Sequence, residues 1–438
     1  METVKIEKIV NRGYGLGKLK DGKVVFVEGA YPGEEVIVRL TLQKSDHAFA
    51  EVVSVVNGSE DRVKPRCKYF RNCGGCHWMD LKYEKQLEYK REVLKDLFTR
   101  EKINVEIPPV EGSDLAFHYR TKMEFHFEGE KLGLRKRNSN VVVDVRRCEI
   151  SPEPFNEALE VVRDAVKVLK IPIYDWEERT GVLKHLVLRY AFSTDQLMVI
   201  FVTKTENFPW GKELKRALLK KIPGIHSIVH VMNSKDSVVL RGPYRTIHGE
   251  GVITEEFDWE KFQIPPTAFF QSNYSITAKL MRHVFEELQL KGNEFVLDLY
   301  AGVGTFSIRI SYQCQRVIAV ESSKVAVKAA KANANINGRR NVEAVEGDVL
   351  AFLKSYDGRA DKVVLDPPRG GAGKEVMREL LRLSPERIVY VSCDPPTLIR
   401  DLKVLLEGGY SLVNLKAFDM FPHTYHIETA ATLVREVS

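Results

Sequence analysis

The chain has 438 residues, which is too many for one ordinary domain, so two or three domains are expected. Apolar residues make up 44% of the chain and charged residues 29%, which is typical of a soluble protein with real hydrophobic cores. The net charge of +6 permits a nucleic acid as partner without requiring one. No apolar run reaches membrane-spanning length and the N-terminus lacks a signal-peptide core. We therefore expect a cytoplasmic protein with no membrane partner, and no protein partner is evident.

Residues 1–57 alternate short apolar segments with turn residues. Strands are expected over 4–6, 24–27, 35–40 and 50–53. The glycine-rich stretch 13–17 and the pairs Asp21-Gly22 and Pro32-Gly33 are read as turns. This pattern predicts a small OB-like β-barrel of the kind that binds single-stranded nucleic acid. Basic residues such as Arg12, Lys23 and Lys44 could follow a phosphate backbone, although a solvated surface is the simpler explanation of the same charges.

Four of the six cysteines are clustered, three of them within ten residues and the fourth far downstream: Cys67, Cys73, Cys76 and Cys148. So few cysteines in so long a chain argue against a secreted disulfide framework. The pair Gly74-Gly75 would let the backbone fold around a metal, so packing alone explains the cluster poorly. Zinc is usually held by two close ligand pairs, whereas a tight triad with a distant fourth thiolate better suits a four-iron cluster. The spacing favours iron–sulfur and leaves zinc open.

The middle of the chain predicts a central α+β domain. An amphipathic helix is expected over 83–100, and Pro108-Pro109 marks a linker. Beyond the linker, strands and helices are mixed, and scattered basic residues suggest RNA without proving it. Strands are expected over 122–127, 141–145, 186–190, 197–203, 227–232 and 237–240, and helices over 152–169 and 211–220.

From about residue 262 the pattern becomes a regular alternation of strands and helices. Strands are expected over 295–299, 317–320, 342–345, 362–365 and 388–391, with helices that include 275–288 and 323–337. Such alternation predicts an α/β fold, a doubly wound Rossmann-like parallel sheet with right-handed crossovers. The expected domains are therefore a barrel over 1–57, a cysteine-bearing central domain over 58–261 and the Rossmann-like domain over 262–438.

The loop 300–305 joins a strand to a helix through two glycines, which lets a ligand approach bare backbone at a helix N-terminus. Glu321 ends the next strand, where a carboxylate is placed for a ribose diol, and Asp298 precedes the loop. Asp348 follows the third strand and could accept a hydrogen bond from an adenine amine. A dinucleotide site would want a further glycine where this chain has Ser307. The combination favours S-adenosylmethionine over a dinucleotide.

The strand 388–391 runs into Cys393 and a turn closed by Pro395-Pro396. Ligands of open α/β sheets bind beyond the carboxyl ends of the strands, so the sulfur of Cys393 would face a cleft. Free cysteines are usually buried and inert, so packing remains an alternative for this stretch taken alone. Cys314 has no such setting and is read as packing.

Three motifs together resemble the signature of RNA uracil-5-methyltransferases: Asp366-Pro367-Pro368-Arg369, Ser392-Cys393-Asp394-Pro395 and His426-Ile427-Glu428-Thr429. The resemblance covers essentially the whole chain. It implies that residues 1–57 are a TRAM barrel and that Cys67, Cys73, Cys76 and Cys148 hold a [4Fe-4S] cluster.

The resemblance also implies the roles of the site residues. Cys393 would be the nucleophile and Glu428 the base, while four further residues would contact S-adenosylmethionine or the target: Gln271, Tyr300, Glu321 and Asp366. Asp348 matches only the generic methyltransferase pattern. Uracil C5 is too poor a nucleophile to take a methyl group directly, so a thiolate adds at C6 and a base later removes the C5 proton. We expect positive charge, from Arg369 or the cofactor sulfonium, to lower the pKa of Cys393.

The RNA is the least determined part of this prediction. Within the resemblance, an N-terminal barrel is more typical of enzymes acting on 23S rRNA, and tRNA uridine-54 in the T-loop is the alternative. An RNA cytosine-5-methyltransferase would set its cysteine after a proline, whereas Cys393 follows Ser392. A radical enzyme would leave one iron open, whereas Cys148 offers a fourth ligand. A non-catalytic RNA-binding scaffold would not need both Cys393 and Glu428.

Overall fold

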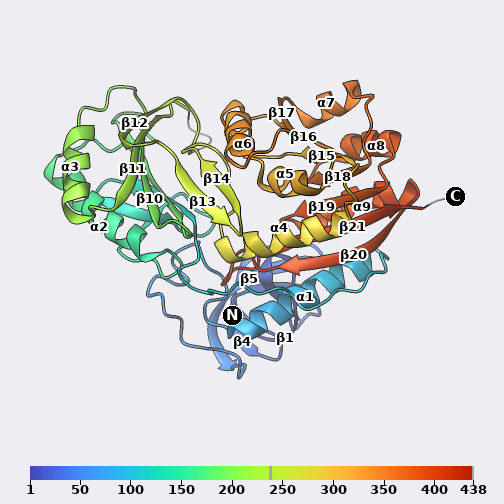
Figure 1. Ribbon diagram of the computed structural model, residues 1–438. Helices are drawn as coiled ribbons and strands as arrows, with labels where there is room; N and C mark the ends of the chain where they lie inside the picture. Colours follow the sequence, from blue (N-terminus) through green and yellow to red (C-terminus); the bar gives the residue numbers. More distant parts are fainter. Residues whose placement is uncertain (236–238, 437–438) are drawn as a thin grey trace.

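The computed structural model describes residues 1–235 and 239–436. Figure 1 shows a barrel at the base of the view, a central sheet on the left and a C-terminal sheet on the right. Helix α4 (Tyr274–Leu288) runs from the centre of the view to the right, along the C-terminal sheet. Among the described residues, no helix is both long enough and apolar enough to cross a membrane.

The N-terminal strands close into the predicted barrel, in the order β1-β2-β3-β5-β4. One expectation was wrong, because the glycine-rich stretch read as turns is largely strand β2. Gly15 and Gly17 face inward, and a Cβ there would lie 2.6 and 2.5 Å from the backbone oxygens of Ala30 and Lys5. These glycines therefore serve close packing rather than a turn. The strands are β1 (Glu2–Val10), β2 (Tyr14–Lys18), β3 (Val24–Glu28), β4 (Glu35–Gln43) and β5 (His47–Asn57).

The central domain is a seven-stranded sheet in the order β12-β11-β10-β9-β6-β7-β8. Its helices α2 (Glu153–Val168) and α3 (Gly211–Lys221), both predicted, pack into the hydrophobic core on one face. β7 and β12 were not predicted. Of the strand expected over 237–240, the first two residues lie outside the described residues and the last two form a bend. The strands are β6 (Lys122–Glu128), β7 (Lys131–Arg135), β8 (Val142–Asp144), β9 (Leu183–Ala191), β10 (Gln196–Thr203), β11 (Ile225–Met232) and β12 (Tyr244–Gly249).

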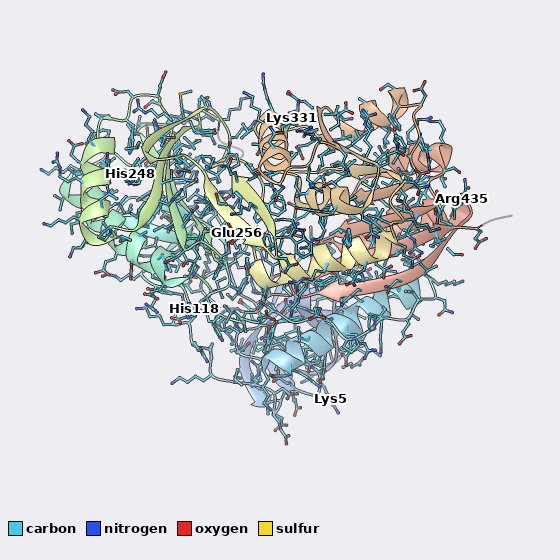
Figure 2. The ribbon with its side chains drawn as sticks, in the orientation of Figure 1. Lys5, His118, His248, Glu256, Lys331 and Arg435 are labelled. Atoms are coloured by element: carbon cyan, nitrogen blue, oxygen red, sulfur yellow. The ribbon has the colours of Figure 1, made fainter. Side chains whose placement is uncertain are left out.

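The other face of the central sheet shares a core with the C-terminal sheet. The hairpin of β13 (Ile253–Phe257) and β14 (Glu260–Ile264) lies between them, and Figure 2 shows Glu256 of this hairpin in that position. One continuous hydrophobic cluster runs from the central sheet through the hairpin and α4 into the C-terminal sheet. The two sheets therefore form one packed unit.

The C-terminal sheet has the order β17-β16-β15-β18-β19-β21-β20. Five strands are parallel as predicted, but β21 runs antiparallel between β19 and β20, so the sheet is mixed. The reason is that the loop 419–427 joins β20 to β21 directly, without the crossover that parallel strands need. The strands are β15 (Phe295–Leu299), β16 (Arg316–Glu321), β17 (Val342–Glu346), β18 (Lys362–Leu365), β19 (Arg387–Ser392), β20 (Tyr410–Phe418) and β21 (Glu428–Arg435).

Helices cover both faces of this sheet, and one of them comes from far upstream. Helix α1 (Tyr83–Arg100) packs its apolar face into the same core as α9 and the C-terminal strands, and Ile9 and Tyr31 of the barrel join this core. All three parts of the chain therefore meet beneath the C-terminal sheet. The remaining helices are α5 (Thr305–Ile310), α6 (Lys324–Ile336), α7 (Val349–Ser355), α8 (Lys374–Leu383) and α9 (Pro395–Glu407).

Candidate active site

Cys393 and Glu428 meet at the same end of two neighbouring strands. Cys393 follows β19 and Glu428 begins β21, and the antiparallel register pairs Ser392 with Thr429. The Thr429 hydroxyl donates to the Ser392 carbonyl at 2.9 Å, which fixes this register at the strand ends. The next step of the ladder places the thiol beside the carboxyl. The structure thus brings together two residues that are 35 positions apart in the sequence.

The turn after Cys393 is rigid, as predicted. The backbone N–H of Asp394 donates to the Ser392 hydroxyl at 3.2 Å. Asp394 then caps α9, because its side chain accepts from the backbone N–H of Thr397 at 3.2 Å, and Pro395 begins the helix. Cys393 is therefore held between a strand and a capped helix.

Asp366 and Gln271 complete this end of the sheet. Asp366 follows β18, the neighbour of β19, and accepts from the Gln271 side-chain amide at 2.9 Å. Thr121, just before β6, holds the Gln271 segment by donating its hydroxyl to the Gln271 carbonyl at 2.8 Å and its N–H to the Ser272 carbonyl at 3.0 Å. The central domain therefore positions the amide that bonds Asp366.

Burial favours the protonated form of each acid in this site. Burial, followed by the charge of Glu428, raises the pKa of Cys393 to about 12, and Arg369 acts in the opposite direction. Arg369 does lower the pKa of Cys393, as expected, but burial outweighs it, so the thiol pKa is raised overall. Burial, followed by the charge of Asp366, holds the pKa of Glu428 well above its usual range. Burial and then Asp298 raise the pKa of Asp366 to about 7, against the Gln271 hydrogen bond.

The loop after β15 is shaped as a ligand cradle. Gly302 and Gly304 have φ of 56° and 88°, and Tyr300 adopts 63°, a strained value for a residue with a side chain. The backbone N–H of Gly302 donates to Glu321 at 3.1 Å, and the other oxygen of Glu321 accepts from the backbone N–H of Ser323 at 2.7 Å. Glu321 is thereby fixed beside the loop, where the sequence placed it.

Two further carboxylates have structural partners. The Ser307 hydroxyl donates to buried Asp298, which explains a serine at the position where a dinucleotide site would carry glycine. Burial nevertheless raises the pKa of Asp298 to about 7. Asp348 caps α7 by accepting from the backbone N–H of Ala351 at 3.0 Å, and its charge contributes to the raised pKa of Tyr300. An adenine contact by Asp348 stays a prediction.

The clustered cysteines come together in space. One largely apolar cavity is lined by Cys67, Cys73, Cys76 and Cys148, with Met79, Leu134 and Ile150 among its other side chains. The backbone N–H of Gly74 donates to the Arg135 carbonyl at 3.0 Å, and a Cβ at Gly74 would lie 3.0 Å from the Arg137 backbone. Over residues 1–235 and 239–436, no set of three or more His, Cys, Asp or Glu side chains is arranged to hold a metal ion.

Comparison with known proteins gives a consistent result over the whole chain. Residues 256–436 match the family of tRNA (uracil-5-)-methyltransferases, and residues 2–53 match the TRAM domain. A Thermotoga maritima protein named "uncharacterized RNA methyltransferase" is 69% identical over 435 residues, 99% of both chains. One of the same name from Clostridium tetani is 36% identical over 95% of this chain and 93% of its own.

A solved structure agrees with these relatives. The tRNA (uracil-54, C5)-methyltransferase of Pyrococcus abyssi, in complex with S-adenosyl-L-homocysteine, is 30% identical with a TM-score of 0.81. The match covers 98% of this chain and 100% of that one. This chain belongs to the RNA uracil-5-methyltransferase family. It is an S-adenosylmethionine-dependent RNA uracil-5-methyltransferase with an N-terminal TRAM barrel.

Sequence reasoning missed how the methyltransferase holds the loop 419–427, which leads into Glu428. His77 and Trp78, directly after Cys76, both donate their backbone N–H to the His423 carbonyl, at 2.7 and 3.0 Å. The side chain of Gln86 accepts from the His423 N–H at 2.9 Å and also contacts its ring nitrogen.

Helix α1 adds a buried ion pair to this loop. Lys90 Nζ lies 2.5 Å from Asp419 Oδ1, and both side chains are 0% exposed. The loop is therefore clamped by residues of the cysteine segment and α1. The sequence signal was a pair of polar residues, Gln86 and Lys90, one helical turn apart on the buried side of α1.

Proposed function

We propose that Cys393 is the nucleophile and Glu428 the base in methylation of a uridine at C5. The observation that carries this proposal is the adjacency of the two side chains across β19 and β21. S-adenosylmethionine supplies the methyl group. The Cys393 thiolate adds to C6, so that C5 becomes nucleophilic and takes the methyl group, and S-adenosylhomocysteine is left as the by-product. Glu428 then accepts the C5 proton, the C5=C6 double bond re-forms and the thiolate leaves.

The protonation of three buried acids, Cys393, Glu428 and Asp366, matters for this reaction. Cys393 and Glu428 both act as anions but are held protonated by burial. Positive charge in the site counteracts this, and Arg369 lowers the pKa of both groups. Because its pKa is about 7, Asp366 carries a proton for much of the time near neutral pH. It can then donate to the uracil carbonyl on which negative charge develops when the thiolate adds.

We propose that the cofactor lies in the cradle after β15. Glu321, held by Gly302 and Ser323, is set to accept from the ribose hydroxyls. Tyr300 is half-buried beside the cradle, where its ring can pack against the ligand. Asp348 is close enough to raise the pKa of Tyr300 and is the candidate partner of the adenine amine. Gln271 and Asp366 then separate the cofactor from the target base.

We propose that Cys67, Cys73, Cys76 and Cys148 hold a [4Fe-4S] cluster. The donor set fits, because four free cysteines line one largely apolar cavity. Three close thiols with a distant fourth suit a four-iron cluster better than zinc, which usually takes two close ligand pairs. Four protein ligands leave no iron open to substrate, so the cluster would have a structural role. It would hold the cysteine segment in place. That segment leads into His77, which donates a hydrogen bond to the loop 419–427.

We propose 23S rRNA as the substrate, because within this family an N-terminal barrel is more typical of the ribosomal RNA enzymes. The second candidate is uridine-54 of tRNA. The Pyrococcus abyssi enzyme supports it, since the match covers that whole chain, so the architecture by itself does not separate the two substrates.

The test is to incubate the purified enzyme with tritiated S-adenosylmethionine and either unmodified 23S rRNA or unmodified tRNA transcripts. We expect 5-methyluridine in 23S rRNA, mapped to defined positions by mass spectrometry. Label confined to the T-loop of tRNA would replace the first substrate by the second. Label in neither RNA, or label on cytosine, would overturn the proposal.

A further inference from the structure

The hairpin of β13 and β14 ends in an exposed tryptophan. Its turn consists of Asp258 and Trp259, and 64% of Trp259 is exposed. The carboxylates on either side are fixed by Arg309 of α5, whose guanidinium lies 2.7 Å from Asp258 and 2.6 Å from buried Glu260. The same guanidinium lies against the Trp259 ring, 5.4 Å from its centre. The indole is therefore held in place at the surface rather than packed into a core.

A second exposed ring and another guanidinium extend this surface. Tyr312, which is 39% exposed, stands edge-on to Trp259 with ring centres 6.1 Å apart. The Arg339 guanidinium lies 4.1 Å from the centre of the Tyr312 ring. The Asn341 side chain donates to two backbone carbonyls of the segment 311–314, at 2.8 and 3.1 Å, and so ties the loop after α6 to Tyr312. Trp, Tyr and Arg are the residue types that contribute most to binding in protein interfaces.

A positively charged groove of about 450 Å³ adjoins these rings. Arg340, the residue after Arg339, lines it together with Arg316. Arg316 pairs with Glu343, whereas neither Arg339 nor Arg340 has a carboxylate partner within the described parts of the chain. Helix α6, which leads to these arginines, carries lysines and no acidic residue. The excess of positive charge suits carboxylates, to which a guanidinium group can donate two parallel hydrogen bonds.

The rings and the groove lie at the edge of the C-terminal sheet opposite the candidate active site. Tyr312 precedes β16 and Arg316 begins it, whereas Asp366 and Cys393 follow the carboxyl ends of β18 and β19. Strands of about five residues separate these two edges by roughly 16 Å. The target uridine enters at the catalytic edge, so methylation does not require the substrate to cover the opposite one.

We propose that this distal surface, formed by Trp259, Tyr312, Arg339 and Arg340, docks an acidic segment of another protein. An apolar side chain of the segment would pack against the two rings, and its carboxylates would pair with the two arginines. A second copy of this chain fits less well, because a two-fold contact would bring the arginines against their own copies. A partner bound at this edge leaves the catalytic edge free, so the enzyme can hold the partner and RNA together.

The test selects twelve-residue peptides from a random phage-displayed library on the full-length protein. The enriched sequence is made as a fluorescent peptide and titrated with each variant by fluorescence polarisation. We expect it to combine several acidic residues with an aromatic or aliphatic one. Trp259→Ala should weaken binding at least about tenfold. Arg339→Ala combined with Arg340→Ala should do the same and should also reduce the salt dependence of binding.

Two variants serve as matched controls, Trp176→Ala in the central domain and Arg378→Ala on α8. Both residues are exposed and lie outside the distal surface, so each substitution should change the affinity less than about twofold. Trp259→Phe keeps a ring and should retain most of the binding even if Trp259→Ala is less stable. An unchanged affinity for S-adenosylmethionine shows that the C-terminal domain of each variant is intact.

The proposal is overturned if no peptide is enriched, if the enriched peptides lack acidic residues, or if Trp259→Ala binds them as tightly as wild type. Displacement of the peptide by a twelve-nucleotide oligoadenylate would also overturn it, because the surface would then bind RNA. A dimer of the wild type that Trp259→Ala dissociates, seen by analytical ultracentrifugation, would assign the surface to a second copy instead.

Discussion

Removing the ammonium group of Lys90, which pairs with Asp419 in the loop before Glu428, should destabilise the enzyme and slow it. Lys90→Met leaves the carboxylate of Asp419 at a site where both side chains are 0% exposed. Asp419 Oδ2 lacks a hydrogen-bond partner among the described residues, and the Tyr83 hydroxyl beside Asp419 carries no charge that could replace the ammonium group. Breaking a buried pair from one side typically costs about 3–5 kcal/mol of unfolding free energy. We expect a loss of this size for the unit that contains the C-terminal sheet.

Urea titration followed by circular dichroism measures the loss of unfolding free energy. The kcat, measured at a urea concentration too low to unfold the variant, reports on the position of the loop 419–427. Lys85→Met is the control, because Lys85 lies on the same helix but pairs with Glu88 at the surface, where a pair is worth about 0–1 kcal/mol. Lys90→Met combined with Asp419→Asn should recover more than half of the lost stability. A loss below about 1 kcal/mol for Lys90→Met, or a double variant as unstable as the single one, would refute the reasoning.

Three further predictions concern the chemistry. Cys393→Ala should abolish methyl transfer with S-adenosylmethionine affinity retained, whereas Glu428→Gln should accumulate a covalent protein–RNA adduct, seen as a shifted band on a denaturing gel. Normal turnover by the Gln variant would exclude Glu428 as the base. Arg369→Gln should shift the pH profile of kcat/KM to higher pH and so lower kcat/KM at pH 7.5 about two- to fivefold. The sign follows because Arg369 lowers the pKa of Cys393 and Glu428, which both act deprotonated; Arg369→Lys should keep the wild-type pH profile, and an unchanged Gln profile would contradict the assignment. Anaerobically purified enzyme should be brown with about four irons, and Cys148→Ala should lose the colour; stoichiometric zinc without visible absorption would disprove the cluster.

Much of the fold could be predicted because local patterns agree with the final structure. Helix α1 begins and ends where its periodicity predicted, and strands β15 to β19 follow the apolar runs closely. The stretch 13–17 could not be read correctly, because Gly15 and Gly17 are required by the inward approach of distant backbone. The position of β21 inside the sheet could not be predicted either, because strand order depends on pairing between distant segments rather than on local sequence.

The candidate active site could likewise be predicted only in part. The motifs led us to propose Cys393 and Glu428, but their adjacency depends on an antiparallel register that no local signal contains. Their raised pKa values follow from burial, which depends on the packing of several segments at once. For the same reason the pair of Lys90 and Asp419, more than 300 positions apart in the sequence, was not foreseen.

The position of β21 has a consequence during protein synthesis. Chains emerge N-terminus first, and β21 is the last of the described strands in chain order although it lies inside the sheet. Until it emerges, the nascent chain has the proposed nucleophile Cys393 but not the proposed base Glu428, and the apolar edge of β19 stays open. An unfinished chain therefore cannot complete the reaction on RNA, and its exposed edge makes it prone to aggregation and a target for quality control.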